Sequence, residues 1–493
     1  MIKKKFLLLA IIVVWVGNSK AQPEFLLNLT HPETDDVVYD TKELSDGTFL
    51  FVGRTFDWAT SCKSPLLIKT DFNGNIESYK QYNFSPYSGD FFNIVEKSGQ
   101  IYVVGDLIDT TNAGINRFFI SELNSNYDTT SLHFFILPDS LDVTDAMSFV
   151  DSSGNFIIFG YLCNKLNIYQ NNMFVYKINM NSKQTQFKLF NDIMFCYDMV
   201  ERKERKGFYA FIFGRSEKNT NEMVRLDSSL NIQSFFSFDQ ILEGVHSSAK
   251  WFSDTTLICV SEIVHSNYPA PGVKRGITSI ILNPEDTIIS QTDIEVNDTL
   301  TFPACRDIIS VNGDNSAYIG GIKNFDVNGG GGYWSTYKSW FSLTRLDKDL
   351  NIIWTKYYGG DAYYVLWTVK ATSDGGCLLL GTRYDYLTQN EERDIFIIKV
   401  DENGNVTSVK DNPGIMAKEA ILYPNPGANT LHIQTALKDA TLEMYDANGR
   451  LVVQQNINET TSVNTSALNQ GMYFYRIMQN GEVKDSGKWV KQQ

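Results

Sequence analysis

Apolar residues between the N-terminus and Asp401 cluster in short consecutive runs that end in glycine. Such runs, apolar on consecutive rather than alternate positions, predict strands that are covered on both faces. No stretch of useful length shows the periodicity of an amphipathic helix, which excludes an α-solenoid. The pattern therefore predicts an all-β fold, and its repeated element is FLFVG (49–53), IYVVG (101–105), FIIFG (156–160), YAFIFG (209–214), AYIG (317–320) and CLLLG (377–381).

A second element recurs downstream of each run, and it is usually a charged residue, an aliphatic residue or Thr, and then Asp or Asn. It returns roughly every 50 residues, the period of a repeat architecture. The fifth unit has this element but lacks the glycine, with Ser261 near that place. The second element therefore marks seven units, at Lys69-Thr70-Asp71, Glu122-Leu123-Asn124, Lys177-Ile178-Asn179, Arg225-Leu226-Asp227, Ile281-Leu282-Asn283, Arg345-Leu346-Asp347 and Lys399-Val400-Asp401.

Each unit has room for four short strands. In the first unit they are expected at 37–44, 48–55, 65–71 and 75–82, with a tight Asp-Gly turn between the first two and an Asn-Gly turn between the last two. Units of four antiparallel strands that stack on their neighbours form the blades of a β-propeller. The sequence therefore predicts a seven-bladed propeller over residues 22–411.

The units resemble a bacterial repeat of YGGD and DGG type. The residues that carry the resemblance are WTKYYGGDAYY (354–364), TSDGGCLLLG (372–381) and IIKVDENGNV (397–406). The resemblance covers residues 35 to 410 and implies a fold rather than a function. The segment EFLLNLT (24–30) matches the fourth strand of a unit, so we expect it to pair with the last unit and close the ring.

The chain changes character after the repeats. Residues 412–420 form a polar linker that contains Pro413 and Gly414, and residues 421–493 read as short alternating strands. Alternation is typical of sheets with one buried face. The pattern predicts a small immunoglobulin-like β-sandwich.

This C-terminal segment resembles the type A sorting domain of the type IX secretion system of Bacteroidetes. The resemblance implies export by the type IX machinery, which would be a partner, followed by removal of the domain and either attachment to surface lipopolysaccharide or release. The protein would then be secreted or on the cell surface. The residues that match the family pattern are Tyr423, Pro424, Asn425, Pro426, Gly449, Leu468, Gly471 and Tyr473.

The N-terminus and the charge agree with export. Three lysines precede an apolar stretch from Phe6 to Val16, and small residues follow, which predicts a signal peptide at 1–21. The formal net charge is −14, and no basic run occurs beyond the N-terminus. Because such a surface repels phosphate backbones, nucleic acid is not expected as a partner.

A search for catalytic motifs finds none. The six cysteines contain no CxxC pair, and the five histidines show no spacing suited to a metal site, so we expect neither a metal nor a cofactor. Cys259 and Cys377 lie in apolar runs and are expected in the core, and disulfide pairing stays open. TSDGGCLLL lacks the tryptophan of the sialidase Asp box. Paired Asp or Glu residues need no motif, so a hydrolase also stays open.

The loops between the second and third strands, and those from the fourth strand to the next unit, open on one face of a propeller. The former are long and aromatic here, for example RTFDWATSCKSP (54–65) and NFDVNGGGGYWSTYK (324–338). Long loops on a rigid scaffold are common binding sites. Asp90 and Asp361 are expected to satisfy turn amides instead. The candidate ligand-binding residues are Asp57, Trp58, Tyr268, Trp334, Tyr337, Tyr384 and Tyr386.

Three classes of function fit these observations. The first is a non-catalytic surface protein that binds a glycan or a protein through this loop face. The second is a secreted carbohydrate-active enzyme that uses two carboxylates on the same face. The third is a structural component of the cell surface. Turnover of polysaccharides would exclude the first class, and binding without turnover would exclude the second.

Overall fold

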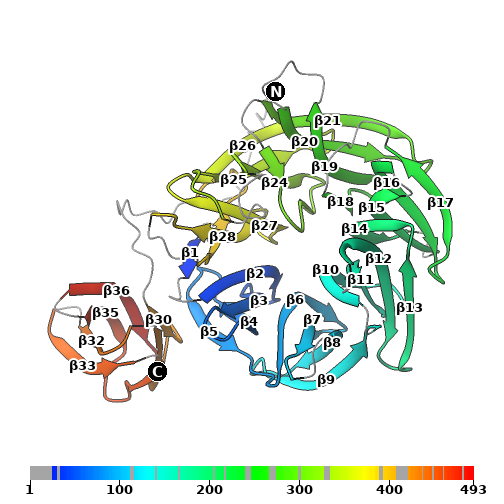
Figure 1. Cartoon of the computed structure of the whole chain (residues 1–493). Helices are drawn as coiled ribbons and strands as arrows, with labels where there is room; N and C mark the ends of the chain where they lie inside the picture. The colour runs from blue at the N-terminus through cyan, green and yellow to red at the C-terminus, as the bar shows by residue number, and fades with distance from the viewer. Residues whose placement is uncertain are drawn as a thin grey trace, which may run out of the picture.

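A computed structural model of the chain shows an all-β protein in its described part (Figure 1). The described part contains no helix suited to crossing a membrane. The expected signal peptide, Tyr268 and most of the expected linker lie outside it. The structure describes residues 25–29, 34–111, 116–138, 141–164, 167–203, 206–215, 218–238, 246–265, 274–297, 301–326, 334–387, 392–406, 420–435, 437–446, 449–458, 460–479 and 482–492.

The repeats fold into antiparallel sheets that follow one another around a centre (Figure 1). Each sheet is a meander of consecutive strands, and its first strand is the innermost. In the first sheet all four strands lie where the sequence predicts them. The first three sheets are β2 (Thr34–Glu43), β3 (Phe49–Asp57), β4 (Cys62–Thr70) and β5 (Ile76–Gln81); β6 (Tyr87–Lys97), β7 (Gln100–Asp109), β8 (Asn116–Leu123) and β9 (Thr129–Ile136); and β10 (Leu141–Val150), β11 (Phe156–Asn164), β12 (Asn167–Asn179) and β13 (Gln184–Phe190).

The next sheets repeat this order. In one of them the innermost position is divided between β22 and β23, which both pair with β24. These sheets are β14 (Ile193–Glu201), β15 (Gly207–Arg215), β16 (Lys218–Asp227) and β17 (Ile232–Ser237); β18 (Ser247–Trp251), β19 (Leu257–His265), β20 (Lys274–Leu282) and β21 (Ile288–Asn297); and β22 (Thr301–Pro303), β23 (Ile309–Val311), β24 (Ala317–Lys323), β25 (Trp340–Leu346) and β26 (Ile352–Gly359).

The N-terminal strand closes the ring. The last sheet consists of β27 (Tyr363–Ala371), β28 (Cys377–Tyr384) and β29 (Asp394–Val400), and β1 (Phe25–Leu29) adds its outer strand. The register pairs Phe25 with Lys399 and Leu29 with Ile395. The expected pairing of 24–30 with the last unit is therefore confirmed.

In the first, second, third and last sheets the repeated glycine stands where the second strand passes close to a carbonyl of the innermost strand. A Cβ on Gly53 would lie 1.9 Å from the carbonyl oxygen of Val37, and one on Gly105 would lie 2.1 Å from that of Asp90. The innermost strand bulges directly beyond this contact, between Val38 and Asp40 in the first sheet. In the fifth unit, which carries Ser261 instead, the pairing of β18 with β19 has no register shift. The glycine therefore accommodates the bulge.

The apolar runs pack between neighbouring sheets, as expected. One core cluster contains Leu50 and Leu67 from the first sheet together with Phe91 and Phe119 from the second. Cys259 and Cys377 are both fully buried in such clusters, which confirms their expected role. All six cysteines are free thiols. Stacked sheets that share their cores in this way hold a ring rigid, so it can position a site at its centre.

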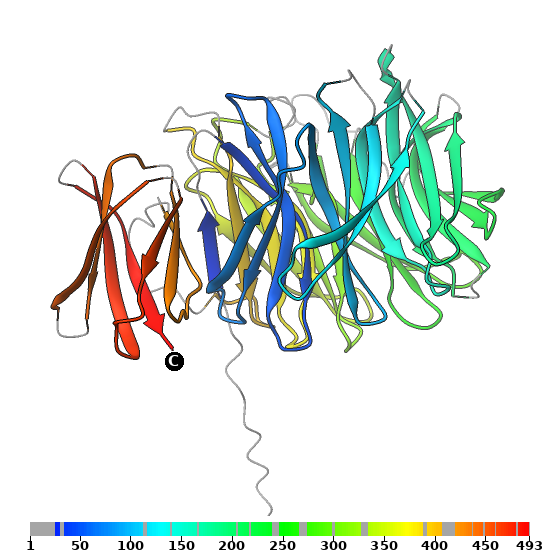
Figure 2. The ribbon, with the colours of Figure 1, turned by 90° about the horizontal axis from the view of Figure 1, so that it is seen from below.

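The C-terminal segment has two sheets around a core of its own, centred on Leu442, Tyr475 and Trp489. It lies beside the ring, next to β1 and β5 (Figure 2). The contact is small: the Asn425 N–H donates to the carbonyl of Ile76 over 3.2 Å, and Tyr423 packs on the cluster that holds Phe25. The two sheets are β30 (Ala420–Tyr423), β31 (Thr430–Thr435) and β34 (Thr460–Asn464), and β33 (Leu451–Ile457), β32 (Ala440–Tyr445), β35 (Gly471–Gln479) and β36 (Glu482–Lys491).

Candidate functional site

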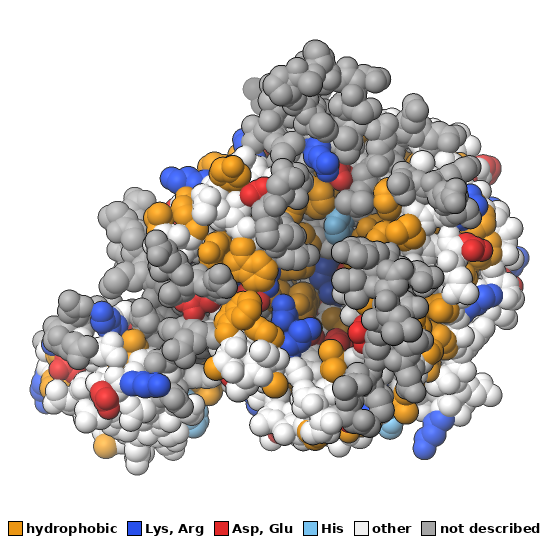
Figure 3. All heavy atoms as spheres, viewed as in Figure 1, with side chains coloured by type: hydrophobic (Ala, Val, Ile, Leu, Met, Phe, Trp, Pro, Cys, Tyr) orange, Lys and Arg blue, Asp and Glu red, His pale blue; other side chains and the backbone are white. Residues whose placement is uncertain are grey.

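Two cavities lie one behind the other along the axis of the ring. The innermost strands run from one to the other, so that Tyr39 and Phe92 line the first cavity while Asp40 and Asn93 line the second. We call the first the upper cavity, because it opens on the face that carries the long loops, which is the face seen in Figure 3. Its volume is about 370 Å³. Hydrophobic and basic side chains surround a hollow there, near the centre of the ring (Figure 3).

Asp90 lies in the upper cavity between two cations. Its carboxylate is 3.2 Å from the Lys63 ammonium and 3.9 Å from Nε of Arg54. The charge of Asp90 raises the pKa of Lys63, although burial opposes the shift. Arg54 also donates to the hydroxyl of Tyr39 over 2.8 Å. Asp90 lies on the innermost strand β6, opposite β7, and its carboxylate contacts these cations rather than the turn amides that we expected.

Asp106 stands opposite Asp90 on β7 and lines the same cavity. Burial raises the pKa of Asp106 to about 7, and the charge of Asp90 adds to that rise. Two carboxylates in one site cannot both ionise easily, since like charges repel in a medium of low dielectric constant. The site thus holds one carboxyl group that lies between two cations and one that retains its proton up to about pH 7.

A second set of charges lines the upper cavity, and Arg54 joins it to the first because it lies 3.7 Å from Asp35. Arg393 forms a two-pronged ion pair with the buried Asp35, at 2.6 and 2.5 Å, and its guanidinium lies 4.3 Å from the ring centroid of Trp334. Arg306 pairs with Asp145 over 3.2 Å. These pairs fix the aromatic and charged lining in place, which favours binding without rearrangement.

Two of the candidates drawn from the loops come together at this cavity. Trp334 lines it, and Trp58 contacts Trp334 with ring centroids 6.4 Å apart while 42% of its side chain stays exposed. Asp57 has a local role, since its carboxylate accepts from the Ala59 N–H over 2.8 Å and from the Thr60 hydroxyl over 2.9 Å.

The remaining candidates lie elsewhere. Tyr337 is 60% exposed and does not line the cavity, and Tyr384 and Tyr386 pack against the core cluster around the last two sheets. Tyr268 lies outside the described residues. Asp361 contacts the hydroxyl of Tyr364 over 2.6 Å and pairs with Arg383 over 2.9 Å.

The sequence did contain a signal for the residues that we missed. Arg54, Asp106 and Tyr161 line the upper cavity, and each directly follows a repeat glycine: Gly53, Gly105 and Gly160. Each of these glycines pairs with the innermost strand of its sheet close to the bulge. The residue after the glycine therefore occupies the equivalent position in all three sheets. A comparison of this one position across the repeats would have found all three.

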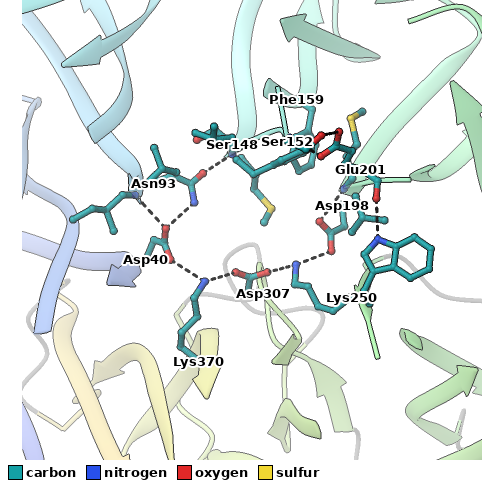
Figure 4. A pocket seen from close by; sticks show the side chains of 18 of the residues that line it. Asp40, Asn93, Ser148, Ser152, Phe159, Asp198, Glu201, Lys250, Asp307 and Lys370 are labelled. Carbon is teal, nitrogen blue, oxygen red and sulfur yellow. Dashed lines mark hydrogen bonds and ion pairs between the residues drawn. The ribbon is translucent and has the colours of Figure 1, made fainter. Parts of the chain in front are cut away.

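The second cavity, of about 580 Å³, is bounded by a chain of alternating charges (Figure 4). Lys370 lies 3.5 Å from both Asp40 and Asp307, and Lys250 lies 3.0 Å from Asp307 and 3.1 Å from Asp198. Although burial opposes both shifts, the two lysines lower the pKa of Asp307, and Asp198 and Asp307 raise the pKa of Lys250. We call these five residues the charge girdle.

The girdle residues also join successive sheets. Asp40 accepts from the amide of Ile94 over 3.1 Å, and Asp198 accepts from the amide of Ala249 over 2.9 Å. Each of these bonds links the innermost strand of one sheet to that of the next. The girdle therefore holds the ring together, and the carboxylates of the second cavity are already paired. Within the described residues, no cluster of three or more His, Cys, Asp or Glu could hold a metal ion.

The motif residues of the C-terminal module have structural partners in that module. The Trp489 indole N–H donates to the carbonyl of Pro424 over 2.9 Å, and the side-chain oxygen of Asn425 accepts from the Val490 amide over 3.0 Å. Gly449 has φ of +78° in its turn, which favours glycine. The Tyr473 hydroxyl donates to the carbonyl of Asn469 over 2.7 Å. The motif thus fixes the turns and the first strand of the module.

Comparison with solved structures gives distant similarities. The β-propeller domain of the Trilobed protease from Pyrococcus furiosus is 8% identical with a TM-score of 0.42, and the match covers 77% of this chain and 100% of that one. An α-L-arabinofuranosidase from Fusarium graminearum is 8% identical with a TM-score of 0.42, over 77% and 98% of the two chains. A puromycin hydrolase is 9% identical with a TM-score of 0.45, over 90% of this chain and 58% of its own length.

No curated protein matches the sequence. The C-terminal module, in contrast, has a clear relative among protein families. Residues 421–492 match the model of the secretion system C-terminal sorting domain, which is the domain that the motif residues predicted. The protein therefore carries a type IX sorting domain, which directs it to the cell surface or the medium.

Proposed function

We propose that this protein is a seven-bladed β-propeller that the type IX machinery exports and that binds a glycan in its upper cavity. The signal peptide at 1–21 and the immunoglobulin-like form of the sorting module belong to this proposal. Support for the blade count comes from the repeat units and from the order of the sheets, each a meander that ends where the next begins. After export the module is removed, and the ring is attached to surface lipopolysaccharide or released.

The observation that carries the binding function is the aromatic and charged lining of the upper cavity. Trp58 and Trp334 offer indole rings at its mouth, and Arg54 and Asp90 offer donors and acceptors deeper inside. Flat rings pack on the apolar faces of sugars, while charged groups bind their hydroxyls. The many ion pairs in the lining keep these groups in fixed positions, as a preformed site requires.

The test is a binding measurement with the purified exported protein on a glycan array and a peptide array. We expect glycan binding, and Trp58→Ala should weaken it roughly two- to tenfold, because one aromatic contact contributes roughly 0.5–1.5 kcal/mol. Tyr337→Ala is the matched control, since Tyr337 is an exposed aromatic outside the cavity. Binding to peptides alone, or an equal loss in both variants, would contradict the proposal.

A further inference from the structure

The two carboxyl groups of the upper cavity face each other across neighbouring strands. Asp90 on β6 and Asp106 on β7 are direct partners in the register, and each is only 7% exposed. Side chains at such positions have Cβ atoms about 5 Å apart, and like charges there are destabilising. Folding alone gives no reason to place two carboxyl groups there. A costly pair inside a cavity is typical of a site that transfers protons.

The surroundings of the two groups differ. Lys63 from β4 and Arg54 from β3 lie beside Asp90, at 3.2 and 3.9 Å from its carboxylate. Burial and the charge of Asp90 favour the protonated form of Asp106, although Lys63 and Arg54 oppose this. Of the other carboxyl groups near the cavity, Asp145 is paired with Arg306, and Asp35 with Arg393. When two neighbouring carboxyl groups are held in different protonation states, one can act as an acid and the other as a base or nucleophile.

We propose that Asp106 and Asp90 form an acid and nucleophile pair that hydrolyses a glycosidic bond of the bound glycan. This inference rests on the proposed function, because the glycan must first occupy the upper cavity. It goes beyond that function, since binding alone needs no protonated carboxyl group. Lys63 and Arg54 act as positioning residues that hold the Asp90 carboxylate in place.

The reaction has two balanced steps. In the first, a carboxylate oxygen of Asp90 bonds to the anomeric carbon, the glycosidic C–O bond breaks, and Asp106 gives its proton to the departing oxygen. In the second, the Asp106 carboxylate takes a proton from water, the water oxygen bonds to the anomeric carbon, and Asp90 is released. The net change is one water consumed and one glycosidic bond cleaved. No oxidant, metal or cofactor takes part in either step.

The spacing of the pair predicts the stereochemistry. Carboxyl groups about 5 Å apart leave no room for a water between them and the sugar, which is the arrangement of retaining enzymes. An inverting enzyme needs about 6.5–9.5 Å. The Cβ atoms of residues directly opposite on adjacent strands are about 5 Å apart, so the carboxyl groups that they carry lie nearer the shorter range. The product should therefore keep the anomeric configuration of the substrate.

The experiment uses the purified exported protein with a panel of polysaccharides and para-nitrophenyl glycosides, scored for binding and for released sugar. We expect turnover that falls as the pH rises above about 7, since Asp106 must carry a proton. Asp106→Asn and Asp90→Asn should each lower turnover of polysaccharides by about 10²–10⁴-fold while binding persists. Asp349→Asn, at an exposed carboxylate outside the cavity, is the control and should change nothing.

Proton NMR of the first product should show the retained anomer, and thermal melts verify that each variant is folded. Binding without turnover, inversion at the anomeric carbon, or full turnover in a folded Asp106→Asn or Asp90→Asn variant would overturn the inference and leave the binding function standing. Absence of glycan binding would instead refute the proposed function, and the inference with it.

Discussion

Replacing Asp106 by Asn should stabilise the ring at pH 8 but not at pH 4. Burial and the charge of Asp90 raise the pKa of this carboxyl group from 3.8 to about 7. Between these values the folded protein holds a proton that the unfolded chain has released. The contribution of Asp106 to the stability of the natural protein therefore falls as the pH rises from about 4 to about 7, and it stays constant above that. Asn cannot ionise, so residue 106 of the variant causes no such loss of stability between pH 4 and pH 7.

The size of the effect follows from the shift. A pKa difference of roughly 3 units between the folded and unfolded states corresponds to about 4 kcal/mol in the free energy of unfolding. This destabilisation is present in full above pH 7. Urea-induced unfolding of the full chain, followed by tryptophan fluorescence at pH 4 to 8, measures it. Asp349→Asn serves as the control, because Asp349 is exposed. A gain that is equal at every pH, or a loss of stability at pH 8, would refute the reasoning.

Three further predictions concern the ring. Lys250→Met should lower the free energy of unfolding by about 3 kcal/mol at pH 7, because it leaves Asp198 and Asp307 without their shared cation. The control is Lys348→Met, which removes the cation of an exposed pair and should have almost no effect in the same urea titration. Gly53→Ala should destabilise the folded protein by about 2 kcal/mol or more, since the new Cβ meets the Val37 carbonyl. Gly313→Ala is the control and should be tolerated, because the space around Gly313 is open. Equal melting temperatures of the two variants would contradict this prediction. A chain that ends at residue 411 should melt within a few degrees of the full chain, because in the described part of the chain the module meets the ring mainly at Asn425 and Tyr423, beside β5. A fall of more than about 10 °C would show that the two depend on each other.

Local features of this protein could be predicted from the sequence because their causes are local. The strands of the first unit follow from consecutive apolar residues between turn residues, and β2 to β5 lie where this rule placed them. The sorting domain was recognisable because its turns and its first strand need particular residues, such as Gly449 at a positive φ. The pairing of 24–30 with the last unit also followed from the repeat, because the segment fills a position that the last unit lacks.

The upper cavity was decided by tertiary structure. Arg393 and Asp35 are 358 positions apart, and only closure of the ring brings them together beside Trp334. The Asp90 carboxylate was expected to satisfy turn amides, whereas the register of β6 with β7 places Asp90 against Asp106, and cations from neighbouring strands contact its carboxylate. Local patterns fix which residues form strands, but charge pairs depend on which strands become neighbours and in what register. That information lies in the packing of the whole ring, so the pattern of a single unit does not contain it.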